Sequence, residues 1–144
     1  MNVYQGRALE GASAVELVVA LYDGIIRFLY AACEAVDRGD EEARRAAVKR
    51  ALEIVLHLQA RLRMDIGGSP AKALSEFYAA TFAQILQGSQ SASRPRLEHA
   101  IACVRNVRDA WREVAREEQG KRLPMVTAPS DSPAPGAGSQ TWSA

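Results

Sequence analysis

The sequence predicts an all-α protein that folds as an antiparallel, up-down four-helix bundle. Apolar residues recur at three- and four-residue spacing in four successive segments, and no segment of useful length alternates with period two. Short connections between these segments favour neighbouring antiparallel helices. The chain has 144 residues, 48% of them hydrophobic, which is enough for one domain with a sizeable core. We expect the bundle over residues 13–119, after an N-terminal segment over 1–12 and before a disordered Pro/Gly/Ser-rich tail over 120–144.

The first helix is expected to begin at Ser13. The segment Ser13-Ala14-Val15-Glu16 has the S-x-x-E form of a capping box, in which the serine and glutamate side chains bond free backbone N–H groups. Gly39 suits the left-handed cap that follows a helix end. The apolar stripe of this helix consists of Val18, Leu21, Tyr22, Ile25, Leu29, Ala32 and Val36.

The second helix is expected to start at Asp40 or Glu41, because acidic residues oppose the positive end of the helix dipole. It ends before the run of helix breakers over 65–70. Its apolar stripe consists of Val48, Ala51, Leu52, Val55, Leu58 and Leu62. Ile54 and Leu56 lie off this stripe, and either the core, a homodimer seam or a groove for a partner would cover them.

The last two helices each begin at a proline. Ser69 and Pro70 suit the cap and first turn of the third helix, and Pro95 suits the first turn of the fourth. We expect a polar loop over 88–93 and an end of the fourth helix near 118–120. The apolar faces consist of Leu74, Phe77, Tyr78, Thr81, Phe82, Ile85 and Leu86, and of Leu97, Ile101, Val104, Val107, Trp111 and Val114.

The residue types that support catalysis are sparse. A di-iron bundle needs Glu-x-x-His pairs, and neither His57 nor His99 has a glutamate three residues before it. Neither Cys33 nor Cys103 adjoins a histidine, and there is no G-x-S-x-G turn. We therefore expect a protein that is not an enzyme, holds no metal or cofactor, and keeps both cysteines as buried thiols in a reducing cytoplasm.

Charge and hydropathy disfavour nucleic-acid and membrane partners. The net charge of +1 supplies no global attraction for nucleic acid. Four arginines form a ridge at helical spacing: Arg105, Arg108, Arg112 and Arg116. Asp109 and Glu113 lie among them and favour a salt-bridged, solvated face. No signal peptide is recognisable, and the apolar stretch over 17–33 is interrupted by charges and shorter than the roughly 20 residues of a membrane span, so we expect a cytoplasmic protein without stable membrane insertion.

A set of short motifs follows in order along the predicted helices. The first are Tyr4-Gln5, Ala12-Ser13-Ala14-Val15-Glu16-Leu17, Leu21-Tyr22-Asp23-Gly24 and Phe28-Leu29. The later ones are Ala51-Leu52-Glu53-Ile54-Val55-Leu56-His57-Leu58, Leu74 with Tyr78, and Arg108-Asp109-Ala110-Trp111. This set, over residues 3–118, resembles the FliS family of flagellin-specific export chaperones of bacterial flagella.

The resemblance implies a cytoplasmic bundle that binds the disordered C-terminal region of flagellin. Such binding would prevent premature polymerisation and present the subunit to the flagellar type III export gate. It also implies a mobile N-terminal segment that covers an apolar groove until the client arrives. The residues alone leave open a generic helical homodimer or adaptor without flagellin specificity.

The resemblance also implies partner-binding residues. Tyr4, Gln5, Ala8 and Leu9 become candidates for a lid or a client contact, with a frayed terminus as the alternative. Either the lid or the bundle itself would be anchored by Tyr22 and Asp23. The remaining candidates are Val48, Ile54 and Leu58 for the groove, and Trp111, although its place in a helical stripe favours the core.

Two departures from the family pattern bear on the client. Ala14 stands where the family usually has proline, but alanine is a good helix former, so Ser13 can still start the helix. The third helix has Phe82 in place of a more aromatic pattern, which would alter the shape of the groove. These departures bear on client affinity and identity rather than on protein class.

Overall fold

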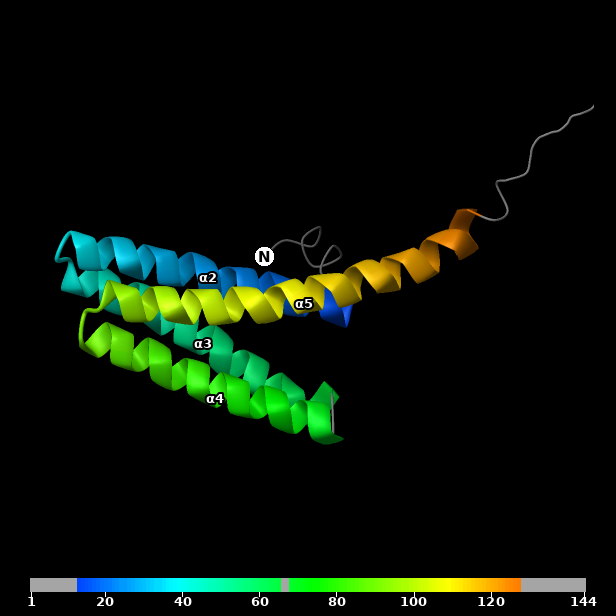
Figure 1. Cartoon of the computed structure of the whole chain (residues 1–144), viewed down its shortest axis with the longest axis horizontal. Helices are drawn as coiled ribbons and strands as arrows, with labels where there is room; N and C mark the ends of the chain where they lie inside the picture. The colour runs from blue at the N-terminus through cyan, green and yellow to red at the C-terminus, as the bar shows by residue number, and fades with distance from the viewer. Residues whose placement is uncertain (1–12, 66–67, 128–144) are drawn as a thin grey trace, which may run out of the picture.

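Four helices make up the part of the chain that the structure describes. The structure is a computed structural model, and it describes residues 13–65 and 68–127. The helices are α2 (Ala14–Asp37), α3 (Glu41–Asp65), α4 (Gly68–Gln90) and α5 (Arg94–Thr127) (Figure 1). Each packs against its neighbour in the chain, and α5 returns against α2, so the predicted antiparallel up-down bundle is confirmed. The N-terminal segment over 1–12 and the end of the tail over 128–144 lie outside the described residues.

Both predicted ends of α2 are confirmed. The backbone N–H of Glu16 donates to Ser13 Oγ over 3.0 Å, and the Ser13 N–H donates to Glu16 Oε1 over 2.9 Å, which completes the capping box. At the other end Gly39 has a φ of +68°. Its N–H donates to the Val36 carbonyl, and the Asp40 N–H donates to the Ala35 carbonyl, so the chain leaves the helix in a Schellman motif.

The prediction of a loop over 88–93 is wrong at its start, because α4 continues to Gln90. Gly88 is buried inside the helix, where an added Cβ would stand 3.0 Å from Leu97 Cδ2. The glycine therefore allows α5 to approach closely and does not break α4. Two residues after the end of α4, Ala92 has a positive φ of 48°, and the Ser93 N–H donates to the Gly88 carbonyl over 2.9 Å, which caps the helix.

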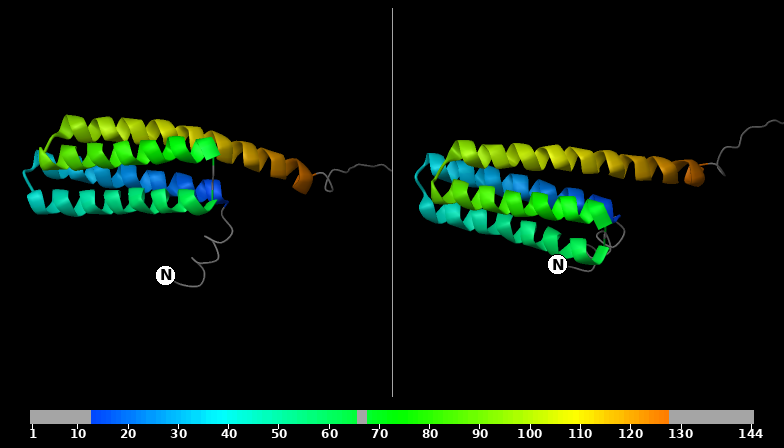
Figure 2. Two further views of the ribbon diagram at one scale, coloured as in Figure 1. Left: turned by 90° about the horizontal axis from the view of Figure 1, so that it is seen from below. Right: turned by 60° about the horizontal axis from the view of Figure 1, so that its bottom comes forward.

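The fourth helix is longer than predicted. It runs to Thr127, so the first part of the expected disordered tail is helical. A single glycine costs a helix only about 1 kcal/mol, and Gly120 does not stop one that is otherwise rich in helix formers. Gln119 Nε2 donates to Glu16 Oε2 over 3.0 Å, which ties α5 to the start of α2. Beyond this contact α5 projects past the other three helices (Figure 2).

The core lies along the inside of all four helices. Its largest fully buried side chains include Tyr22, Ile25, Leu29, Val55, Ile85, Leu97 and Val104. Cys33 is a buried free thiol as expected, but Cys103 is only partly buried, with its sulfur 3.8 Å from His99 Nε2. Among the described residues no helix is both long and apolar enough to cross a membrane.

Candidate partner-binding surface

Tyr22 lies in the bundle core. It has no exposed surface, and its hydroxyl lies 2.7 Å from the hydroxyl of Tyr78 on α4. The two rings meet edge to face, with centroids 6.2 Å apart. Burial raises the pKa of Tyr22 well above its usual value, and the hydrogen bond to Tyr78 adds to the rise. This placement favours the interpretation of Tyr22 as an anchor of the bundle.

Asp23 joins α2 to the arginine ridge of α5. Its carboxylate lies 2.8 Å from Arg108 Nη1 and 3.8 Å from Arg112 Nη2. Arg108 also pairs with Asp109 over 3.1 Å, and these partners raise its pKa. The ridge is therefore largely a salt-bridged face, as the sequence predicts, and Asp23 anchors one helix to another.

A small apolar pocket lies at the end of the bundle where α2 and α4 begin. Its volume is about 180 Å³. Trp111 is half-buried at this pocket and Leu58 is almost fully buried there, with an exposed fraction of 2%. The other lining residues are Ala14, Val15, Val18, Arg61, Leu62, Leu74 and Tyr78. The pocket adjoins the first turn of α2, which directly follows the N-terminal segment.

A longer groove runs between α3 and α4. It consists of two hollows of about 550 and 310 Å³ that share Leu56 and Phe82. Leu56 is 55% exposed and Leu86 is 38% exposed, so large apolar side chains face solvent here. The groove is also lined by Arg44, Arg45, Val48, Lys49, Leu52, Glu53, Val55, Gln59, Tyr78, Ala79, Ser89 and Gln90. We call this surface the α3–α4 groove.

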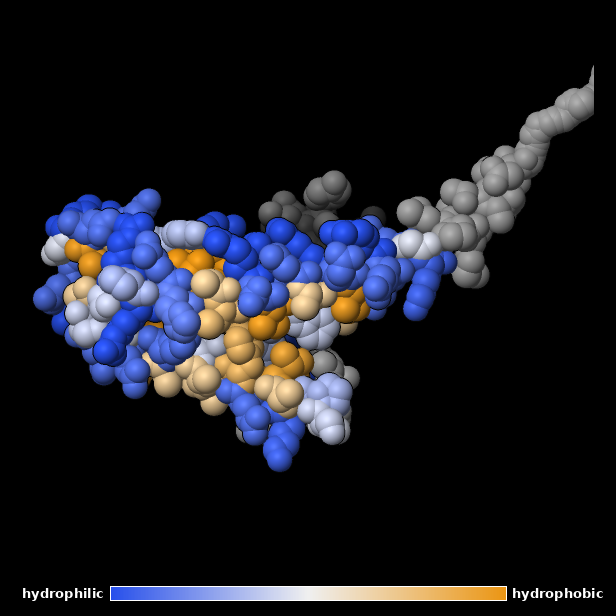
Figure 3. Space-filling view, viewed as in Figure 1, coloured by the Kyte–Doolittle hydropathy of each residue, from blue (hydrophilic) through white to orange (hydrophobic). Residues whose placement is uncertain are grey.

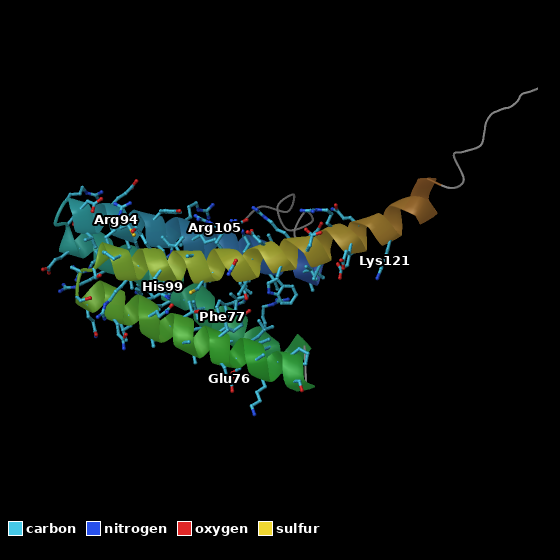
Figure 4. The ribbon with its side chains drawn as sticks, viewed as in Figure 1. Glu76, Phe77, Arg94, His99, Arg105 and Lys121 are labelled. Atoms are coloured by element: carbon cyan, nitrogen blue, oxygen red, sulfur yellow. The ribbon has the colours of Figure 1, made fainter. Side chains whose placement is uncertain are left out.

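Apolar side chains also gather over α4 and along its border with α5, whereas the outer side of α5 is mainly hydrophilic (Figure 3). Phe77 of α4 lies at this border (Figure 4) and is half-buried. The apolar surface therefore extends around α4 as far as its border with α5. Surface of this kind on a small protein marks an interaction site.

The predicted groove residues lie deeper than the groove surface. Val48 is 4% exposed and contributes only to the floor. Ile54 is half-buried at the interface with α2, where its Cδ1 stands 3.0 Å from the position of a Cβ on Gly24. Tyr4, Gln5, Ala8 and Leu9 lie outside the described residues. Leu56 lies off the main apolar stripe of α3, and this position is the feature of the sequence that indicates the open face. The predicted partner-binding residues did not include Leu86 or Arg44, which also line the groove.

The described residues contain no group of three or more His, Cys, Asp or Glu side chains placed to hold a metal ion. The candidate binding surface consists of the open α3–α4 groove and the small apolar pocket beside the start of α2.

Comparison with known proteins gives the family. Residues 1–118 match the family model described as flagellar protein FliS. The chain is 30% identical to the flagellar secretion chaperone FliS of Campylobacter jejuni over 117 residues, which cover 81% of this chain and 91% of that protein. It is 28% identical to the protein of that name from Vibrio cholerae over 109 residues, 76% of this chain and 80% of the relative. The chain therefore belongs to the FliS family, a family of flagellar secretion chaperones and not of enzymes.

Proposed function

We propose that this protein binds the C-terminal region of flagellin in the cytoplasm, prevents its premature polymerisation and presents it to the flagellar type III export gate. Membership of the family of flagellar secretion chaperones supports an export substrate as the client. The observation that carries the proposal is the open α3–α4 groove, where Leu56 and Leu86 face solvent beside Phe82. A partner that covered these side chains would gain the free energy of removing them from water.

The shape of the groove suits an amphipathic helix. Leu52 and Leu56 on α3 and Phe82 and Leu86 on α4 are each one helical turn apart, so they form two parallel rows. A client helix with apolar residues at i, i+3, i+4 and i+7 would lay its stripe between these rows. A client that is disordered before binding spends part of the interaction energy on ordering, which keeps the complex releasable for export.

The N-terminal segment would act as a lid in this proposal. Its residues Tyr4, Gln5, Ala8 and Leu9 precede α2, whose first turn lines the small apolar pocket with Ala14 and Val15. Deleting residues 1–12 is expected to leave the bundle folded and to alter client affinity. An unchanged affinity would remove the lid role.

The test of the client is a binding experiment with the purified C-terminal segment of flagellin. We expect a 1:1 complex in size-exclusion chromatography and a gain in helicity by circular dichroism. Leu56→Asp is expected to weaken the complex. The matched control is Tyr30→Asp, since Tyr30 is 41% exposed on α2, outside the groove, beside Arg105.

Failure of wild-type protein to form the complex, with the segment's helicity unchanged, would contradict the proposal. Light scattering on the free protein tests the alternative that the apolar face is a homodimer seam. A stable dimer that Leu56→Asp dissociates would favour that alternative.

A further inference from the structure

Arg44 is a buried cation at one end of the α3–α4 groove. Its side chain is 9% exposed, and its Nε donates to Ser89 Oγ over 3.3 Å. Among residues 13–65 and 68–127, no carboxylate lies within ion-pair distance of its guanidinium, and Ser89 is the one hydrogen-bond partner of its side chain. A buried charge without a counter-ion is costly, so this position favours a carboxylate supplied from outside.

The surroundings of Arg44 strengthen the attraction for an anion. Arg45 and Lys49 line the same hollow, against the single carboxylate of Glu53. Arg45 is already paired with Glu41 over 3.2 Å, whereas Arg44 has no ion-pair partner within residues 13–65 and 68–127. The cationic end of the groove thus has one buried guanidinium that is free to bind a carboxylate in a bidentate fashion.

At the other end of the groove, Gln59 offers a hydrogen-bond acceptor, whereas Arg44 offers donors. Its Nε2 donates to Ser75 Oγ over 2.6 Å, but its Oε1 is buried and has no hydrogen-bond partner among the described residues. Gln59 lines the hollow that continues the groove beyond Leu56 and Phe82. An unsatisfied buried acceptor costs about as much as a lost hydrogen bond, and a donor from a bound partner would remove this cost.

These two groups match the two ends of one helix. Arg44 and Gln59 are separated on α3 by about 22 Å, at roughly 1.5 Å per residue, which is the length of a client helix of about 15 residues. The first turn of a helix has free N–H donors, and its last turn is the negative end of the dipole. A helix therefore satisfies both groups only when its N-terminus lies at Gln59 and its C-terminus at Arg44.

We propose that the α3–α4 groove selects the direction of the bound client: Arg44 binds the α-carboxylate at the end of the client chain, and Gln59 accepts a hydrogen bond from the first turn of its last helix. The client helix runs antiparallel to α3. This inference rests on the proposed function, which makes the client the C-terminal region of a chain, so that the carboxylate available at the cationic end is the chain terminus. An acidic side chain near that end is the competing source.

Two peptides test the carboxylate. They have the sequence of the last 20 or so residues of the organism's flagellin, one with a free acid and one with an amide at the C-terminus. Isothermal titration on the full-length protein is expected to show the free acid binding roughly 10- to 100-fold more tightly, as for loss of one charged hydrogen-bonded pair. Arg44→Gln is expected to bind both peptides with equal, weak affinity, and Arg44→Lys to restore part of the difference.

The outcomes separate this inference from the proposed function. If neither peptide binds although the whole C-terminal segment does, the groove does not hold the last helix of the client and this inference is wrong. If the whole segment also fails to bind, the proposed client is wrong. If both bind equally tightly, the client stands and the terminal carboxylate subsite is wrong. The two peptides could also bind the wild-type protein equally while Arg44→Gln weakens both. In that case an acidic side chain, and not the α-carboxylate, binds Arg44. A wild-type melting curve for Arg44→Gln is the check that this variant folds.

Direction is tested independently by a nitroxide on the N-terminal residue of the free-acid peptide. The label is expected to broaden backbone NMR signals near Ser75 and Ala79, and to leave those of Ser89 and Gln90 sharp. Broadening at Ser89 and Gln90 instead would mean the opposite orientation and would overturn the proposal. A peptide labelled at its third residue from the C-terminus provides the matched control, with the reverse pattern.

Discussion

Removing the hydroxyl groups of Tyr22 and Tyr78, singly and together, measures what the buried pair contributes to stability. The hydroxyls lie 2.7 Å apart and link α2 to α4 across the core. Either single change to phenylalanine leaves the other hydroxyl without its partner, and an unsatisfied buried polar group costs about 1–3 kcal/mol. The double change removes both hydroxyls, so it is expected to cost less than the sum of the two single changes.

The two single changes are expected to differ. In Tyr22→Phe the remaining Tyr78 hydroxyl belongs to a residue that lines both the small pocket and the α3–α4 groove, where we expect water to replace the lost partner. In Tyr78→Phe the remaining Tyr22 hydroxyl has no acceptor for its proton in the part of the chain that the structure describes, and Tyr22 is 0% exposed. We therefore expect losses of about 1 kcal/mol for Tyr22→Phe and about 3 kcal/mol for Tyr78→Phe.

Urea unfolding at pH 7, followed by far-ultraviolet circular dichroism, measures these free energies. The comparison holds when the variants share the denaturant slope of the wild type. In a thermal melt, a loss of about 1 kcal/mol corresponds to a fall of about 4 °C in Tm for a bundle of this size. A coupling energy of about 2 kcal/mol is expected from the double-mutant cycle. Strictly additive losses, or a larger loss for Tyr22→Phe than for Tyr78→Phe, would refute this account of the pair.

Three further predictions follow from the core and the helix ends. Stability should fall as the pH rises above about 10, because burial raises the pKa of Tyr22 and Tyr78 in the folded state and the unfolded chain therefore loses these protons first. Urea unfolding between pH 8 and 11 checks this. The double phenylalanine variant should show a smaller fall, to which Cys33 contributes because burial also raises its pKa. Ala92→Gly should stabilise by about 0.5–1 kcal/mol, because the positive φ of 48° is unfavourable for alanine; an unchanged Tm would contradict this. Gly88→Ala should destabilise by about 1–2 kcal/mol despite the better helix propensity of alanine, because the new Cβ would meet Leu97, and a more stable variant would show that Leu97 moves aside.

Sequence predicted the features that depend on neighbouring residues. The capping box at Ser13 and the glycine cap at Gly39 lie within one turn of the helix ends that they set, so the sequence contains the whole signal. The end of α4 depends instead on a tertiary contact. Gly88 is a helix breaker by propensity, yet it stays helical because its missing side chain makes room for Leu97. Without knowledge of that contact, the sequence favours a loop.

The open face of the bundle was harder to predict, because the apolar stripe of a helix identifies only the residues that face the core. Val48 and Leu58 belong to the main stripe of α3 and are 4% and 2% exposed, so neither supplies open surface. Leu56 lies off the stripe and is 55% exposed, which makes it the better guide to the groove. Which off-stripe residues stay open depends on where α4 lies, and no local pattern gives the position of a neighbouring helix.

Arg44 shows the same limit for charge. It lies among several basic residues near the start of α3, and such a run normally indicates a solvated face. Its neighbour Arg45 follows that rule and pairs with Glu41 at the surface, whereas Arg44 is buried against Ser89, a residue near the end of α4. The same residue type thus has two roles one position apart, because a helix turns about 100° per residue and only one of the two faces α4. The family follows from motifs along the chain, but the group that would fix the direction of a client depends on this packing of α3 against α4.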